Sequence, residues 1–294
     1  MFYRRKLILG LLETFEGQLS KISLQKLLLL ITQRQKEPSY DFVPYKFGCY
    51  SFSAKADLNT MVKKGFLTES KDDFTKIDSE NYLPQLKPFD QSIIRDVKKY
   101  YGHMSANALM LHTYINFPYW AIKSIKAKEI LNERFMERVE KQKPVREDIT
   151  LFTIGYEGIS LEEYLNRLIK NDIKILVDVR NNPKSMKFGF SQSTLSRYCD
   201  ALGIAYMHFP EVGIVSEKRQ TLDSQVDYDK LFESYRNTTL LNTLPTQENI
   251  LQLLRTHKRI ALTCFEAEIC QCHRKHLAES ITFLPEWEYN LEHI

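Results

Sequence analysis

The stretch Lys174-Ile175-Leu176-Val177-Asp178-Val179-Arg180 decides the fold of the C-terminal half of the chain. Its run of aliphatic and β-branched residues is typical of a strand that is buried on both faces. Three similar runs lie at residues 151–156, 205–209 and 259–265. Helical patterns separate these runs, at residues 161–170, 194–202, 228–236 and 247–257. This alternation predicts an α/β fold with a parallel sheet and flanking helices, in which Ser160 and Thr246 are N-cap residues.

The N-terminal half has a different pattern, in which helical spacing dominates. Leu7, Leu11, Leu12 and Phe15 predict a first helix that stops before Gly17, and Ser23 is the expected cap of a second. Further helices are predicted at residues 54–64, 92–101, 105–114 and 127–139. The aromatic stretch at residues 40–52 is expected to be extended or hairpin-like. Short helices around a small extended element predict a winged-helix-like recognition domain.

A charged, proline-containing segment at residues 141–148 separates the two patterns. We therefore predict two domains, residues 1–145 and 150–294. Residues 1–150 hold 25 Lys and Arg against 18 Asp and Glu, whereas the whole chain of 294 residues has a net charge of only +4. A basic N-terminal half raises the odds of a contact with DNA or RNA.

Composition excludes several classes of protein. With 12% aromatic and 43% hydrophobic residues, the chain is neither disordered nor low in complexity. Its longest apolar run, residues 27–31, is far below the roughly 18 residues that span a bilayer. The five cysteines show no spacing of a disulfide framework. We expect a cytoplasmic protein that does not contact a membrane; the sequence does not indicate its oligomeric state.

Three polar clusters follow predicted strands, where a parallel sheet binds its ligands. They are Gly155-Tyr156-Glu157-Gly158, Asp178-Val179-Arg180, and the pair Cys264-Phe265-Glu266 and Cys272-His273-Arg274. Carboxylates close together can divide acid and base roles, so proton transfer is assigned to Glu157, Asp178 and Glu266. Asp178 and Arg180 also fit a purely structural ion pair.

Ligand binding is assigned to side chains that carry charge, a ring or an imidazole. Cations suit a phosphate and rings suit a base, by charge and by stacking. The assigned residues are Tyr156, Arg180, Lys187, Phe188, His273 and Arg274.

The cysteines near the C-terminus allow two further interpretations. Cys272 is predicted at a helix N-terminus, where the dipole and nearby cations would favour a reactive thiolate, so it is a candidate catalytic residue. Cys264, Cys270, Cys272 and His273 are the candidate ligands for zinc, but they lack the usual pairs of spaced cysteines. We therefore predict neither a metal nor a cofactor.

Residues 151–283 resemble the family called domain of unknown function 488. The shared motifs are Thr153 to Gly158, Leu176 to Arg180 with Pro183 and Ser185, Phe190-Ser191, Gly203 to Tyr206, and Cys264-Phe265-Glu266 to Cys272-His273-Arg274. The resemblance implies the α/β fold but no reaction. The charged loop at residues 211–219 also looks family-like, and its charges would close over a ligand. Residues 1–115 resemble Panacea-type antitoxin domains through Phe42 to Ser51, with Cys49 in place of a proline, which implies a recognition or regulatory module.

Three functions are compatible with these features. The first is a nucleic-acid-associated enzyme that acts on a nucleotide, a base or another phosphate-bearing group at the carboxyl edge of the sheet. The second is a thiol-based redox or sulfur-carrier protein that uses Cys272, resolved by Cys264 or Cys270. The third is a regulator without turnover, which binds DNA or a partner and senses a small anionic ligand.

Overall fold

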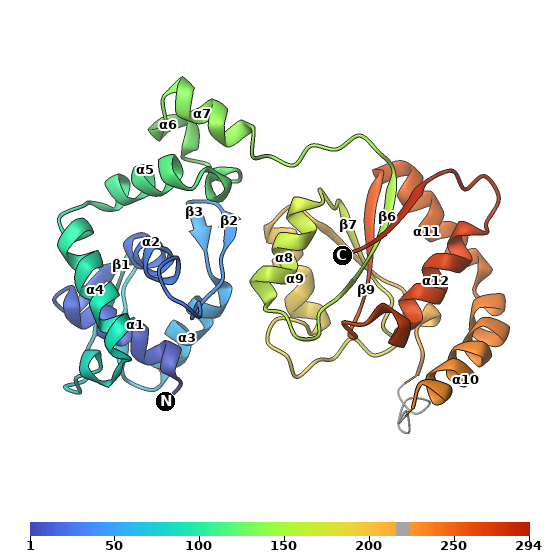
Figure 1. Cartoon of the computed structure of the whole chain (residues 1–294), viewed down its shortest axis with the longest axis horizontal. Helices are drawn as coiled ribbons and strands as arrows, with labels where there is room; N and C mark the ends of the chain where they lie inside the picture. The colour runs from blue at the N-terminus through green and yellow to red at the C-terminus, as the bar shows by residue number, and fades with distance from the viewer. Residues whose placement is uncertain (216–223) are drawn as a thin grey trace. The chain divides into compact units, whose positions relative to one another are not determined.

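The chain forms two compact units, Met1–Lys143 and Pro144–Ile294, in a computed structural model that describes residues 1–215 and 224–294 (Figure 1). Each unit has a hydrophobic core of its own. The charged positions Glu217, Lys218 and Arg219, which we expect to close over a ligand, lie outside the described residues.

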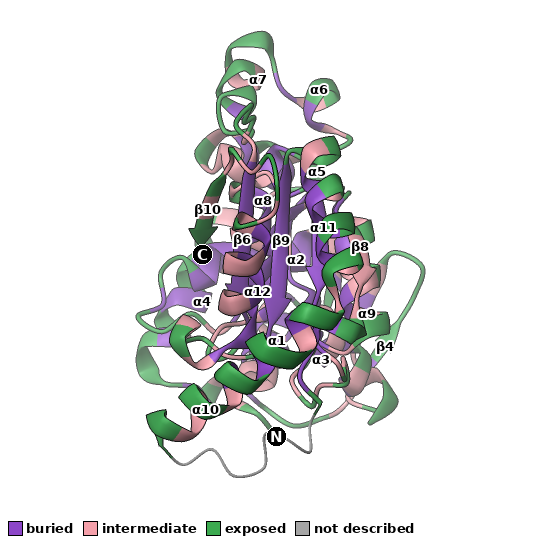
Figure 2. Ribbon diagram, turned by 90° about the vertical axis from the view of Figure 1, so that its right-hand side faces the viewer, coloured by how far each residue is buried: buried purple, intermediate pink, exposed green. Residues whose placement is uncertain are grey.

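The C-terminal unit is built on a five-stranded parallel sheet, which confirms the predicted fold class. The strands are β6 (Thr150–Gly155), β7 (Ile175–Asp178), β8 (Ala205–His208), β9 (Arg259–Cys264) and β10 (Asn290–His293). Their order across the sheet is β10-β6-β9-β7-β8, so β9 lies between the first two strands of the unit. Every residue of β6, β7 and β9 is buried, as expected for central parallel strands (Figure 2).

Helices cover both faces of this sheet. Figure 1 shows α8 (Leu161–Lys170) and α9 (Gln192–Ala201) on one side, and α10 (Gln225–Tyr235), α11 (Leu244–His257) and α12 (His273–Thr282) on the other. A π-helical turn, Arg236–Leu240, follows α10. The core of the second face joins alternate strand residues such as Val177 and Leu262 to Leu254 and Leu277 of the helices. This is the alternation that the period of two in a strand requires.

Two details of the predicted elements change. Ser160 caps α8 as expected, since its Oγ accepts from the Glu163 amide at 3.0 Å. Thr246 does not cap α11, because this helix already begins at Leu244, and the Thr246 hydroxyl donates to Glu211 instead. The edge strand β10 is not predicted from the sequence; it is short and mostly exposed, so it lacks the apolar run of a buried strand.

The N-terminal unit is mainly helical. Its helices are α1 (Tyr3–Thr14), α2 (Lys21–Thr32), α3 (Phe52–Lys63), α4 (Pro88–Tyr101), α5 (Ala106–Asn116), α6 (Ala127–Ile130) and α7 (Glu133–Glu140). Strands β1 (Gln18–Ser20), β4 (Leu67–Glu69) and β5 (Asp73–Lys76) form an antiparallel sheet of order β1-β5-β4. The aromatic stretch forms the hairpin of β2 (Val43–Tyr45) and β3 (Gly48–Tyr50), which confirms the extended prediction.

Two predictions for this unit were wrong in detail. The cap of α2 is Ser20 rather than Ser23, because the Ser20 Oγ accepts from the Ser23 amide at 3.0 Å and the helix starts three residues earlier than expected. The single helix expected over residues 127–139 divides into α6 and α7, since Asn132 is extended and its side chain caps the second segment. Within the described residues, no helix has both the length and the apolar character needed to cross a membrane.

The end of β6 approaches another part of the backbone unusually closely. A Cβ atom added at Gly155 would lie 1.9 Å from the carbonyl oxygen of Glu266, which is far inside contact distance. Because this neighbour is backbone, a side chain at position 155 would push apart the two loops that follow β6 and β9.

We predict that Gly155→Ala lowers the free energy of unfolding of the C-terminal unit by more than about 3 kcal/mol. Hydrogen exchange of the β6 and β9 amides in the full chain measures this quantity. Gly203→Ala is the matched control, since its Cβ would meet open space and only the positive φ of 72° is unfavourable. That control should cost about 1–2 kcal/mol. Equal losses in the two variants would contradict the close approach at Gly155.

Candidate functional site

The end of β7 carries a fully buried ion pair. Asp178 has no exposed surface, and Arg180 is 5% exposed. The guanidinium donates two hydrogen bonds to the carboxylate, from Nε to Oδ1 at 2.8 Å and from Nη2 to Oδ2 at 2.5 Å. Tyr206 of β8 donates its hydroxyl to the same Oδ2 at 2.5 Å. Burial opposes the charge of Arg180, but its hydrogen bonds to Asp178 raise its pKa above the ordinary value.

The remaining donors of Arg180 hold the start of the next loop. Its Nη1 donates to the Tyr156 hydroxyl at 2.7 Å and to the Phe190 carbonyl at 2.9 Å. The Tyr156 ring stacks on Phe190, with centroids 4.2 Å apart and planes within 9°. Arg180 and Tyr156 therefore support each other and the loop after β7, and the Tyr156 ring already has a stacking partner.

Other predicted ligand-binding cations also contact the protein itself. Lys187 donates from Nζ to the Tyr156 carbonyl at 2.5 Å, and burial lowers its pKa. Arg274, 2% exposed, donates to the carbonyls of Glu266 at 2.6 Å and Ala267 at 3.2 Å. Lys187 therefore stabilises the loop after β6, and Arg274 stabilises the loop after β9.

Two predicted residues lie toward the surface. Glu157 is exposed, and its carboxylate accepts from the Ala267 amide at 3.0 Å, so it fastens the loop after β9. Phe188 is 43% exposed and lies 6.4 Å from the ring of Tyr198.

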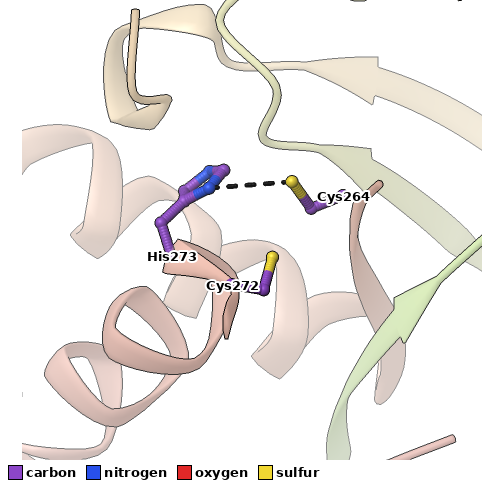
Figure 3. A group of neighbouring side chains, drawn as sticks. All are labelled: Cys264, Cys272 and His273. Atoms are coloured by element: carbon purple, nitrogen blue, oxygen red, sulfur yellow. Dashed lines mark hydrogen bonds between the residues drawn. The ribbon is translucent and has the colours of Figure 1, made fainter. Parts of the chain in front are cut away.

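Sulfur and imidazole meet at the carboxyl end of β9 (Figure 3). Cys264 is the last residue of this strand, Cys272 precedes α12, and His273 begins that helix. The loop between them folds back, so that the Cys264 Sγ lies 3.6 Å from the His273 Nδ1. The Cys264 thiol donates a hydrogen bond to the Glu266 Oε2 at 3.2 Å. Cys264, Cys272 and His273 are all buried.

The tautomer of His273 follows from its other contact. Its Nε2 lies 3.0 Å from the carbonyl oxygen of Val179, which can only accept a hydrogen bond. Nε2 therefore carries the proton, and in the neutral ring Nδ1 is an acceptor that faces the Cys264 thiol. A nucleophile, a base and a group that orients the base are the three parts of an activated thiol site.

The second thiol has a different environment. Cys272 has no exposed surface, and burial together with the neighbouring Cys264 raises its pKa well above the ordinary range of a thiol. Cys270, the other candidate resolving residue, is exposed. Cys49 and Cys199 are buried in other parts of the chain.

A cavity of about 300 Å³ opens beside these groups. Cys264 and His273 form one wall of it, and Cys272 is not among its lining residues. The rest of the lining comes mainly from the loops after β6 and β7: Tyr156, Arg180, Asn181, Asn182, Lys184, Ser185 and Met186, with Ile214 and Phe265. This volume fits a small polar molecule.

The same sulfur and imidazole atoms are those that could hold a metal ion. The ligand atoms of Cys264, Cys272 and His273 lie within 4.8 Å of one another. Two cysteines and a histidine form a ligand set found in catalytic zinc sites; if zinc were bound, these three residues would hold it and the contact of His273 with Val179 would orient the ring. Metal content is therefore a necessary measurement at this site.

Several site residues have roles that the sequence interpretation does not assign. Cys264 is interpreted there as a resolving thiol or a zinc ligand and not as the attacking thiol, although its place at the end of a buried strand is a signal for that role. The sequence interpretation assigns no role to Tyr206, Asn181 or Asn182, because only the packing of the strands and the fold of the loop bring them to Asp178 and to the cavity.

We predict that Asp178→Asn destabilises the C-terminal unit by about 3 kcal/mol or more, because Arg180 would stay buried without a counter-ion. Urea unfolding measures this loss through the fluorescence of Trp287 in a Trp120→Phe background. Asp172→Asn is the control: its partner Lys174 is 49% exposed, and such surface pairs contribute less than about 1 kcal/mol. A loss at Asp178 no greater than that at Asp172 would show that the buried pair does not hold this edge together.

A comparison with family models finds a match in the C-terminal unit. Residues 160–281 match the model described as Domain of unknown function DUF488. The match begins just before α8 and ends within α12, which confirms the resemblance drawn for the C-terminal part of the chain. No protein with a curated description matches the chain. The resemblance of residues 1–115 to Panacea-type antitoxin domains stays a prediction.

Proposed function

We propose that the C-terminal unit carries out thiol–disulfide exchange on a small polar disulfide, with Cys264 as the attacking thiol and Cys272 as the resolving thiol. The observation that carries this proposal is the contact of the Cys264 Sγ with the His273 Nδ1 at the wall of the cavity. This assignment exchanges the roles that the sequence suggested for the two cysteines, because Cys264 lines the cavity and Cys272 does not.

In the first step, His273 Nδ1 takes the proton of the Cys264 thiol. The thiolate attacks one sulfur of the substrate disulfide, so that a mixed disulfide forms and the substrate S–S bond breaks. The departing thiolate takes the proton back from the imidazolium and leaves as a thiol. The contact of Nε2 with the Val179 carbonyl keeps the ring oriented through both proton transfers.

In the second step, Cys272 attacks the Cys264 sulfur. Its high pKa keeps it protonated at first, and part of that effect is the charge of the neighbouring Cys264. The second substrate thiol leaves with the proton that Cys272 loses. In total, one substrate disulfide becomes two thiols and the protein dithiol becomes the Cys264–Cys272 disulfide.

The expected result is specific for each cysteine when the reduced full chain is treated with hydroxyethyl disulfide and followed by mass spectrometry. Cys264→Ser should abolish the reaction at the site, and Cys272→Ser should accumulate the mixed disulfide at Cys264. His273→Ala should slow the attack by roughly 10²-fold, the usual contribution of a general base. Cys199→Ser is the control and should react as the native chain does, because burial raises the pKa of that thiol to about 12.

Two outcomes would contradict the proposal. One is an unchanged rate of mixed-disulfide formation in Cys264→Ser. The other is a zinc ion that co-purifies with the native chain at one per molecule and is lost in both Cys264→Ser and Cys272→Ser, since the sulfurs would then be occupied as metal ligands.

A second candidate function, contact with single-stranded nucleic acid, is supported by a feature of the N-terminal unit. A cavity of about 700 Å³ is lined by the exposed rings of Phe2 and Phe89 and by the cations Arg4, Lys36 and Lys87. The Lys36 ammonium lies 5.8 Å from the centroid of Phe89. Rings beside cations are what non-specific single-strand binding requires. Helices α1, α2 and α3, with strand β1 after α1 and the β4–β5 hairpin after α3, also fit the winged-helix prediction, although the β2–β3 hairpin lies between α2 and α3.

We predict that Phe89→Ala and Lys36→Glu each weaken the binding of a fluorescent single-stranded oligonucleotide by about fivefold or more at low salt. Fluorescence anisotropy at several salt concentrations measures the affinity, and Lys36→Glu should also flatten its dependence on salt. Phe283→Ala, at an exposed ring of the C-terminal unit, should change nothing. Equal effects of Phe283→Ala and Phe89→Ala on the affinity would contradict binding of the oligonucleotide at the N-terminal cavity.

A further inference from the structure

The N-terminal unit contains a second cavity, of about 470 Å³, which none of the functions above uses. It lies between the first turns of α2, the β2–β3 hairpin and the β4–β5 turn, and Ala106 at the start of α5 also lines it. Most of its wall is apolar. A largely apolar cavity of this size with a few placed polar groups is typical of a small-molecule site.

One of those polar groups is a buried lysine. Lys26 of α2 is 1% exposed, and its Nζ donates to the Cys49 carbonyl oxygen at 3.0 Å. Burial lowers its pKa, and the neighbouring Cys49 thiol acts in the opposite direction. No carboxylate among the described residues forms an ion pair with Lys26, although a buried ammonium without a counter-ion is costly. The fold thus holds a buried amine without a carboxylate partner among the described residues, and an anion beside it would stabilise its protonated form.

The absence of a side chain at Gly48 leaves space beside the Lys26 amine. Gly48 has a φ of +90°, and a Cβ there would lie 2.5 Å from the Tyr114 ring and 3.3 Å from the Lys26 Nζ. Any other residue would press on the Tyr114 ring, be strained at this φ, and crowd the amine. Gly48 is therefore the residue that lets the hairpin close over Lys26 without displacing the amine.

The mouth of the cavity is also positive. Lys46 and Lys71 line it and are exposed, whereas Asp72 is the only carboxylate among the described lining residues. Lys21 lines it as well, but it is paired with Glu69 at 2.7 Å. An anion that enters meets cations at the rim and the unpaired cation at the wall.

We propose that this cavity binds an organic carboxylate with an apolar body, whose head group accepts a hydrogen bond from the Lys26 Nζ. The carboxylate supplies the counter-ion that the fold omits, and the apolar wall covers the body of the ligand. A cationic ligand of the same shape would be repelled by Lys26 and by the rim.

Calorimetric titration of the full chain with hexanoate, 1-hexanol and hexylamine tests the proposal. Hexanoate should bind more tightly than 1-hexanol, and hexylamine should not bind. Lys26→Met keeps the size of the side chain and should weaken hexanoate by roughly tenfold or more, while 1-hexanol keeps its affinity. Lys71→Met, at the rim, is the matched control and should change hexanoate affinity less than about threefold.

Equal affinities of the native chain for hexanoate and 1-hexanol would overturn the proposal, as would full hexanoate binding by Lys26→Met. If Lys26→Met does not fold, ¹⁵N-detected spectra of the lysine side chains in the native chain decide the question. Hexanoate should then shift the Lys26 Nζ resonance more than those of Lys46 and Lys71. An unmoved Lys26 resonance would also overturn the proposal.

Discussion

The buried contact between Asp178 and Arg180 governs the geometry of the whole carboxyl edge of the C-terminal sheet. Two charges are removed from water at the end of a strand without exposed residues, so each requires the other. The remaining Arg180 donors reach Tyr156 after β6 and the Phe190 carbonyl in the loop after β7. Tyr206 adds the edge strand β8 to the same carboxylate. The Asp178–Arg180 ion pair thereby connects the ends of β6, β7 and β8 with the loop after β7.

This arrangement changes which residues are available for chemistry. Arg180 and Arg274 are the cations that a reader of the sequence would assign to a phosphate, yet the first is committed to Asp178 and the second to backbone carbonyls. Sulfur and imidazole occupy the cavity wall instead. The orientation of His273 comes from the Val179 carbonyl, which belongs to the residue between Asp178 and Arg180. The sheet edge that the Asp178–Arg180 ion pair holds in place therefore also orients His273, the proposed base.

The N-terminal unit uses a buried charge in another way. Lys26 is buried without a carboxylate partner among the described residues, and burial lowers its pKa. A bound anion would favour its protonated form. The two units therefore differ: one contains a complete buried ion pair, and the other contains a buried amine to which our proposal assigns a ligand as the partner.

Sequence alone determined the elements of the α/β unit, because runs such as residues 174–180 carry a strong apolar signal and Ser160 marks the start of a helix by local hydrogen bonding. It also determined which chemical groups follow the strands, since the carboxyl ends of parallel strands meet at one edge. Weaker local signals led to wrong caps at Ser23 and Thr246 and gave no prediction of β10, whose residues are mostly exposed.

Only the tertiary structure decided which of those groups face one another. Whether Arg274 meets a ligand or a carbonyl, and whether Cys264 or Cys272 lines the cavity, depends on how the loop after β9 folds back over eight residues, Phe265 to Cys272. Gly48 and Lys26 are separated by more than twenty positions, and their closeness follows from the packing of the hairpin on α2. Local sequence patterns determine helices and strands because the interactions that form them are local. A functional site depends instead on the distances between elements, and only tertiary packing sets those distances.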